Sequence, residues 1–401
     1  LELAEKALSD WVLELRRSHP AYLALQYPEP FDAAKAQREA GSRGAAILEY
    51  ALGERRSQAW LVTANGFEMV SLPARVVIEK EVRQFRNVAA RRPRDAAGLQ
   101  AWRINAAGLY GLLIEPLRGR LRSGQPLIVV PDGILHYLPF ETLLEPGSQR
   151  RFLIEDHDIS YAPSASSLGS LPPDAGGKPR ELLAFGDPVF SLSPGQARPT
   201  ELARLVRGVY DRAGMGLPPL PSTRAEVERL AALYPPERSK VYLGRDASEA
   251  TLKRERLAEY RRLHFATHAV LDEQVPARSG VVLSLVNPAD EDGVLQMNEI
   301  FNLDLDADLV VLSACQTGLG RLVRGEGMIG LTRAFLYAGS PRVVVSLWEV
   351  NDLATADFMA AFYGAMRRGA APAAALREAK LSFLRSDAHA YRHPYFWAPF
   401  V

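Results

Sequence analysis

From residue 223 onward, the chain alternates short apolar runs with longer segments of helical pattern, and this alternation restricts its fold more than any other feature. The runs at 263–267 and 308–313 suit strands that are buried on both faces, whereas 354–367 carries the helical spacing of apolar residues. Strands that alternate with helices predict a parallel-rich sheet with helices on both faces. We therefore expect an α/β fold for this part of the chain.

The first part of the chain shows other patterns. Apolar residues recur at spacings of three and four near the N-terminus, which predicts a helical segment over 1–40. Asn65-Gly66 between two apolar runs is a strong turn signal and predicts a small antiparallel hairpin. A helix over 99–121 and a strand at 127–130 are expected to follow.

Proline and glycine are concentrated in 191–222, which makes this stretch the best domain boundary in the chain. The capping-box pattern Thr223-x-x-Glu226 predicts a helix that opens at Thr223 and runs to about Leu233. We therefore expect four parts: an N-terminal helical segment that could end a repeat array (1–40), a front α/β half (41–190), a linker (191–222) and a rear α/β half (223–401).

Composition excludes several classes of protein. The chain has 48 Lys and Arg against 47 Asp and Glu, a net charge of +1, which gives no electrostatic case for nucleic acid or an anionic membrane surface. A single cysteine, Cys315, excludes an internal disulfide and a four-cysteine zinc site. The sequence has neither a long apolar span nor a signal-peptide pattern, so we expect a soluble, cytoplasmic protein.

Two predicted strands end in side chains that are able to do chemistry together. The run 263–267 leads into His268, and the run 308–313 leads into Cys315. Reactive groups gather beyond the carboxyl ends of parallel strands, so the two residues meet if their strands are neighbours. A histidine beside a cysteine accepts the thiol proton and yields the nucleophilic thiolate. The alternative interpretation is structural, with a small buried cysteine and a hydrogen-bonded core histidine.

Other polar residues support less specific interpretations. His264 precedes His268 by four residues, so it faces the same side of a strand and is expected in the core or behind the site. No group of His, Asp and Glu has metal-ligand spacing, and the glycines after Cys315 do not match a phosphate-binding loop. We therefore expect neither a metal nor a cofactor, and a nucleotide-binding protein is unsupported.

The arrangement resembles that of a known family. His268 precedes Cys315 by 47 positions, and in caspases the histidine lies about 50 residues before the cysteine. Several stretches of the sequence resemble the CHAT domain, a bacterial caspase-like protease family that is related to separase and typically follows tetratricopeptide repeats. These stretches are 264–268, 308–320, 325–335, 345–352 and 393–400, with weaker similarity at 130–140 and 161–164.

The resemblance implies roles for particular residues. His268 and Cys315 would form the catalytic pair, and the backbone N–H groups of Ala269 and Cys315 would form the oxyanion hole. Caspase-like proteases typically have glycine after the histidine, where this chain has Ala269. If the backbone there has a positive φ, the Cβ of Ala269 costs about 1 kcal/mol or more.

Asp352 and Trp348 follow the predicted strand 343–347. From position alone, Asp352 either caps the next helix or presents a charge to substrate, and Trp348 is either a core aromatic or a wall of a substrate groove. In separase-like relatives, the aspartate of the similar stretch binds a basic P1 side chain, the residue before the cleaved bond. The resemblance therefore implies that Asp352 selects Arg or Lys, with Trp348 beside it.

These expectations combine into one hypothesis. The chain is a cysteine endopeptidase with an inactive front half and an active rear half, and it cleaves a protein substrate through a thioester. The substrate is expected to lie in extended form against the edge of strand 343–347. The resemblance places such proteins in regulated bacterial pathways, including antiviral defence, with tetratricopeptide repeats or a regulatory partner. The alternative is a catalytically weak or inactive caspase-fold interaction module.

Overall fold

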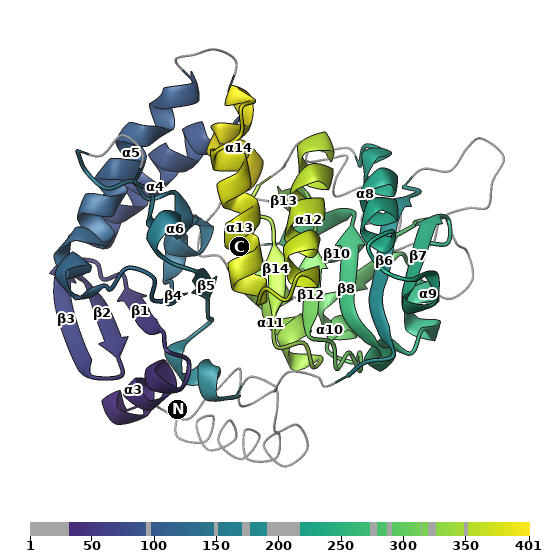
Figure 1. Ribbon diagram of the computed structural model, residues 1–401, viewed down its shortest axis with the longest axis horizontal. Coiled ribbons are helices and arrows are strands. Elements are labelled where there is room, and N and C mark those ends of the chain that lie inside the picture. Colours follow the sequence, from purple (N-terminus) through teal and green to yellow (C-terminus); the bar gives the residue numbers. More distant parts are fainter. Residues whose placement is uncertain are drawn as a thin grey trace, which may run out of the picture.

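The computed structural model describes residues 32–93, 98–147, 151–170, 177–190, 217–272, 279–286, 291–313, 315–319, 326–348 and 352–401. Most of the helical segment predicted over 1–40 lies outside these residues; the part that is described contains helix α3 (Ala33–Ser42). Three sheets organise the described chain (Figure 1). Below, the front half denotes the described residues up to 170, and the rear half those from 177 onward.

The front half is built on a five-stranded sheet in the order β3-β2-β1-β4-β5. Its strands are β1 (Ala46–Ala51), β2 (Ser57–Thr63), β3 (Gly66–Leu72), β4 (Leu127–Val130) and β5 (Ile159–Tyr161). The predicted hairpin is confirmed: β2 and β3 pair antiparallel, and the register Thr63↔Gly66 leaves Ala64 and Asn65 in the turn. The pairs β1–β4 and β4–β5 are parallel.

Helices cover both faces of this sheet. Adjacent strand residues point to opposite faces, and Ile47 belongs to an apolar cluster with α3, whereas Leu48 belongs to the main core with α4 and α5. The predicted helix 99–121 is α5 only as far as Leu113, because Pro116 cannot continue an α-helix. The helical elements are α4 (Arg75–Ala89), α5 (Gly98–Leu113), α6 (Leu153–Asp156) and the 3-10 turns η1 (Glu115–Arg120), η2 (Gly133–Tyr137), η3 (Phe140–Thr142) and η4 (Ala165–Ser170).

The main sheet of the rear half is wholly parallel, in the order β14-β12-β8-β6-β7. Its strands are β6 (Arg180–Pro188), β7 (Ser239–Gly244), β8 (Tyr260–Ala266), β12 (Leu309–Leu312) and β14 (Val343–Val345). The parallel α/β fold predicted from the alternation is confirmed. The predicted extent of the front half, 41–190, was wrong in one respect. β6 lies within this range, but it pairs with β7 and β8 and therefore belongs to the rear sheet.

Helices also cover both faces of the rear sheet (Figure 1). His264 and Phe265 are adjacent on β8; His264 contacts α8 and α12, whereas the ring of Phe265 lies 6.1 Å from that of Phe335 on α11. The helices are α8 (Ser222–Ala231), α9 (Glu249–Arg254), α10 (Met297–Ile300), α11 (Glu326–Tyr337), α12 (Asp352–Arg367), α13 (Pro372–Leu384) and α14 (Pro394–Trp397), with 3-10 turns η5 (Pro236–Arg238), η6 (Leu257–Glu259) and η8 (His389–Arg392). None of the described helices is long and apolar enough to cross a membrane.

A second, four-stranded rear sheet has the order β11-β10-β9-β13. Its strands are β9 (His268–Asp272), β10 (Gly280–Val282), β11 (Val294–Gln296) and β13 (Cys315–Leu319). β10 and β11 pair antiparallel. The chain thus leaves β8 and β12 of the first sheet and enters the second sheet at β9 and β13.

The predicted capping box at the start of α8 was wrong. The N-cap of α8 is Pro221, and no side chain caps the helix. The Thr223 hydroxyl instead donates to the Leu220 carbonyl and accepts from the Asp187 N–H. The carboxylate of Glu226 lies 2.9 Å from Nε2 of His264.

Buried polar contacts join the two halves. The ammonium group of Lys380 on α13 pairs with the carboxylate of Glu141, and both side chains are almost completely buried. The Tyr161 hydroxyl donates to the second carboxylate oxygen of Glu141 at 2.6 Å. The guanidinium of Arg377 donates to the carbonyls of Ile154 and Glu155. The front sheet is therefore fixed to the helices that cover the rear sheet.

Candidate active site

The structure brings His268 and Cys315 together, as the sequence predicted. β9 and β13 pair in parallel, and His268 and Cys315 are direct partners in their register. Partners on neighbouring strands lie about 4.8 Å apart. The alignment begins in the first sheet, where Phe265 of β8 pairs with Leu312 of β12. Because β8 and β12 both lead into the second sheet three residues after this pair, His268 and Cys315 enter it side by side.

The imidazole of His268 is held in one orientation. Its Nε2 lies 2.9 Å from the carbonyl oxygen of Pro218, and its ring centroid lies 4.9 Å from that of Phe190. A carbonyl only accepts, so Nε2 carries a hydrogen. In the neutral ring the lone pair therefore resides on Nδ1, which is the nitrogen able to accept a proton.

Sequence reasoning missed both residues that hold the ring. Phe190 directly precedes the stretch 191–216, and Pro218 lies just after it. Both lie in or beside a proline-rich region that was interpreted only as a linker. No local pattern reports such contacts, since Pro218 and His268 are 50 residues apart. Phe190 also belongs to an apolar cluster with Leu220, Val270, Val282, Leu285 and Val294.

Ala269 lies inside the second sheet and has extended backbone geometry. It pairs with Val281 on one side and Gln316 on the other, and its exposed fraction is 4%. Among the described non-glycine residues, those with positive φ are Asp187 and Asp306. The strain considered for alanine at this position therefore does not arise, because β-strand geometry suits any L-residue.

Trp348 is a packed aromatic. It is 5% exposed, and its indole N–H donates to the carbonyl of Tyr395 at 3.2 Å. The guanidinium of Arg86 lies over its ring, 5.7 Å from the centroid. These contacts correspond to the core alternative considered from sequence. Asp352 is the first residue of α12, close behind β14, which places it at a helix start as expected.

The chain's own C-terminal residues pair with β14. Val345 and Val401 exchange two backbone hydrogen bonds, and the Leu347 N–H donates to the Pro399 carbonyl at 2.8 Å. We had expected substrate to add to the edge of strand 343–347. That expectation was wrong for 345–347, because residues 399–401 already occupy this edge.

His264 has the supporting place that its spacing predicted. Its Nε2 lies 2.9 Å from Glu226 on α8, and its Nδ1 lies 3.1 Å from the Tyr363 hydroxyl on α12. It is completely buried. His264 therefore links β8 to α8 and α12 through hydrogen bonds.

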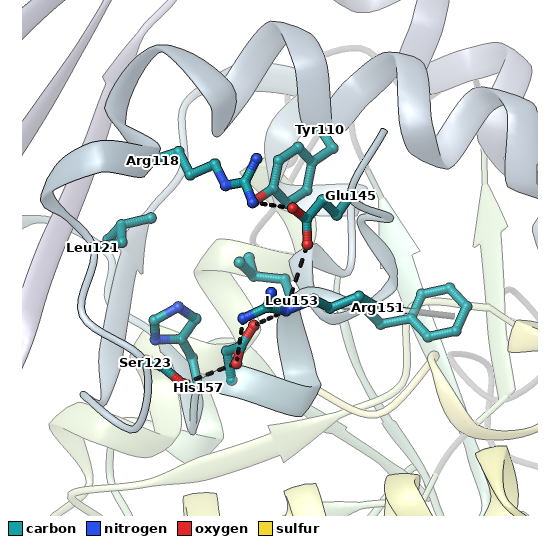
Figure 2. A pocket seen from close by; sticks show the side chains of 10 residues that line it. Tyr110, Arg118, Leu121, Ser123, Glu145, Arg151, Leu153 and His157 are labelled. Carbon is teal, nitrogen blue, oxygen red and sulfur yellow. Dashed lines mark hydrogen bonds and ion pairs between the residues drawn. The ribbon is translucent and has the colours of Figure 1, made fainter. Parts of the chain in front are cut away.

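A small polar cavity of about 120 Å³ lies in the front half (Figure 2). The charged groups on its wall pair with one another: Arg118 with Glu145, and Arg151 with Asp156 at 3.0 Å. The Ser123 hydroxyl also donates to Asp156 at 2.9 Å. The charged groups on the cavity wall are therefore already paired with one another.

Three carboxylates of the rear half approach one another, those of Glu249, Glu291 and Glu299. The ammonium group of Lys253 lies between them, at 2.7, 2.7 and 2.8 Å respectively. Burial raises the pKa of Glu249 to about 8. Lys253 supplies the positive charge that a metal ion would otherwise bring.

Comparison with known proteins places the chain in a family. A family model described as the CHAT domain matches residues 103–401. Human tetratricopeptide repeat protein 28 is 30% identical over 332 residues, and the mouse protein is 29% identical over 331 residues. Each match covers 73% of this chain but only 13% of the relative, so the chain spans a small part of these proteins.

Among solved structures, one chain of the Saccharomyces cerevisiae separase–securin complex superposes with a TM-score of 0.51. The match covers 91% of this chain and 30% of that chain, at 11% identity. Identity this low shows a shared fold alone. The chain therefore belongs to the CHAT domain family and has a caspase-like α/β fold.

Proposed function

We propose that the chain is a cysteine endopeptidase in which His268 and Cys315 act as the catalytic pair. The observation that carries this proposal is their register: the single cysteine of the chain is the direct strand partner of a histidine. The Pro218 carbonyl supports it further, because it fixes the hydrogen on Nε2 and leaves Nδ1 as the base.

The proposed reaction has two stages. Nδ1 of His268 takes the thiol proton, and the thiolate of Cys315 forms a bond to the scissile carbonyl carbon. The tetrahedral intermediate then collapses, the C–N bond breaks, and the imidazolium gives its proton to the leaving amine. His268 next takes a proton from water, the hydroxide attacks the thioester, and the acid product leaves as the thiol is restored.

We assign the oxyanion hole to the backbone N–H groups of Cys315 and Ala269. The two residues lie on adjacent strands, one position apart in the register. A pair of fixed N–H donors lowers the barrier because the developing negative charge meets them without reorganisation.

We assign substrate selection to Asp352. It begins α12 just after β14, and β14 is the neighbour of the strand that leads to Cys315. A carboxylate pairs with Arg through two parallel hydrogen bonds, or with Lys as a point charge. Cleavage is therefore expected after Arg or Lys, and Trp348 stabilises the segment before Asp352 by packing.

The test is cleavage of a peptide library that varies the P1 residue, with Cys315→Ala as the inactive variant. We expect cleavage after basic residues by the wild-type chain and none by Cys315→Ala, with the thermal melt changed by only a few degrees. Proteolysis that survives in Cys315→Ala would refute the assignment. Failure of the wild-type chain to cleave any peptide would favour the second candidate.

The second candidate is a caspase-fold interaction module without catalysis. The burial of His268, which is only 2% exposed, favours it. Alkylation by iodoacetamide distinguishes the two: an activated Cys315 reacts faster than a model thiol, and His268→Ala removes the excess rate. If Cys315 of the wild-type chain reacts no faster than a model thiol, the result supports the interaction module.

The setting of the activity is also a proposal. Tetratricopeptide repeats are expected to accompany the domain or to regulate it, and the names of the human and mouse relatives support that expectation. A regulated bacterial pathway, including defence, is supported only by the family resemblance.

A further inference from the structure

Arg86, on α4 of the front half, contacts the segment that leaves β14 in the rear half. Its Nη1 donates to the Tyr137 carbonyl at 2.7 Å, and its Nη2 donates to the Leu347 carbonyl at 3.1 Å. The guanidinium also lies over two rings, 5.0 Å from the centroid of Tyr137 and 5.7 Å from that of Trp348. One side chain thus connects a turn of the front half to the end of a rear strand.

The chemistry of this contact requires arginine. Burial lowers the pKa of Arg86 to about 10, so the side chain stays protonated at neutral pH. A guanidinium is planar, so its two ends can reach two carbonyls while its face stacks on aromatic rings. An ammonium group is a point donor and cannot bridge both carbonyls in this way.

The segment held by Arg86 is clamped from both sides. The C-terminal residues hold it through the Leu347 N–H and the Trp348 indole N–H, which donate to Pro399 and Tyr395. Arg86 holds the Leu347 carbonyl and the face of the Trp348 ring from the front half. The chain then reaches Asp352 within four residues of Trp348.

We propose that Arg86 is a positioning residue for substrate selection, through which the front half fixes the segment 346–348 and hence Asp352. This inference rests on the proposed protease function and on the assignment of Asp352 to P1. It gives the front half a task in the reaction, although that half carries no cysteine.

The first experiment measures the contact between Arg86 and residues 346–348 and does not require proteolytic activity. Hydrogen exchange of residues 346–348 is compared in the Cys315→Ala background, alone and with Arg86→Met, Arg86→Lys or Arg83→Met. Arg83 lies on the same helix, is exposed and pairs with Glu79, so it is the matched control. We expect the Leu347 amide to exchange about tenfold faster in Arg86→Met and less so in Arg86→Lys, with Arg83→Met unchanged.

The second experiment measures the ratio of kcat/KM for matched peptides with Arg and Ala at P1. A displacement of about 1 Å can cost up to 100-fold, so we expect Arg86→Met to lower this ratio roughly 10-fold to 100-fold, through KM more than kcat. Arg83→Met should leave the ratio unchanged. If Arg86→Met does not melt cooperatively, Arg86→Lys replaces it in both experiments.

The outcomes separate the two proposals. Unchanged exchange in a folded Arg86 variant overturns the positioning role, whatever the kinetics. Faster exchange with an unchanged ratio overturns the link to selection. If the wild-type chain cleaves no peptide, the protease proposal fails, while the exchange result still decides whether the front half fixes the segment.

Discussion

The front half and the rear half each place a histidine shortly after a parallel strand, but the structure that follows the strand differs between them. In the front half, β4 ends at Val130, and the chain turns at once into the short helix η2, which carries His136. In the rear half, β8 ends at Ala266, and the chain continues into a second sheet that begins with His268. In the first arrangement the half-buried histidine has no cysteine to face, whereas the second aligns its histidine with Cys315.

The difference shows where the candidate chemistry originates. Burial lowers the pKa of His136 to about 4, so it stays neutral at physiological pH, and the front half has no cysteine for it to activate. The Asp132 carboxylate accepts from the Leu52 N–H at 2.7 Å and so has a structural use. A parallel strand end is therefore insufficient, and the extra sheet creates the pair.

The largest expected effect comes from the two histidines. His268→Ala should lower kcat/KM by about 10⁴-fold or more, because the cysteine loses its base. His136→Ala should leave the rate within about twofold if the front half has no part in proton transfer. Peptide cleavage is measured for both variants, with circular dichroism as the control for folding. An equal loss of kcat/KM in the two variants would contradict the assignment of the chemistry to the rear half.

The contact between the halves is tested next. Lys380→Met leaves the buried carboxylate of Glu141 without its cation, and removing one partner of such a pair costs about 3–5 kcal/mol. Chemical denaturation of the variant measures the loss. The double variant Lys380→Met with Glu141→Gln should recover part of it. A single variant as stable as the wild type would mean that the halves do not depend on this pair.

Selection is tested with two aspartates that each follow a strand. Asp352→Asn should reduce the preference for Arg over Ala at P1 by about 2–5 kcal/mol, because the substrate cation loses its partner. Asp132→Asn is the matched control in the front half and should leave the preference intact. The ratio of kcat/KM for Arg and Ala peptides reports both. A basic preference that persists in Asp352→Asn would restrict this residue to the start of α12.

The smallest effect is expected at Ala269. Glycine in a strand interior loses more conformational freedom on folding, so Ala269→Gly should lower the free energy of unfolding by about 0.5–1 kcal/mol. Because the backbone is already extended, kcat/KM should not rise. A clear increase in kcat/KM would show that the backbone adopts another geometry when substrate binds.

The sequence predicted the parallel rear sheet and the meeting of His268 with Cys315, because apolar runs and strand ends are local patterns. It did not predict β9 and β13, because these short strands are paired by residues far away in the chain. The same reason explains the misplaced β6, whose partners lie beyond the linker. Glu226 shows a third limit: a capping motif gave way to a buried histidine that only the fold brings near.

The closure of β14 by residues 399–401 also bears on association between molecules. An open edge strand presents unpaired N–H and C=O groups that invite another chain to add to the sheet. The C-terminal residues take these groups at one edge of the main rear sheet, and at the opposite edge β7 carries the charged Lys240. The ammonium group of Lys240 pairs with the Glu255 carboxylate at 2.6 Å. The covered edge at β14 is thus the one that the chain itself closes to an added strand.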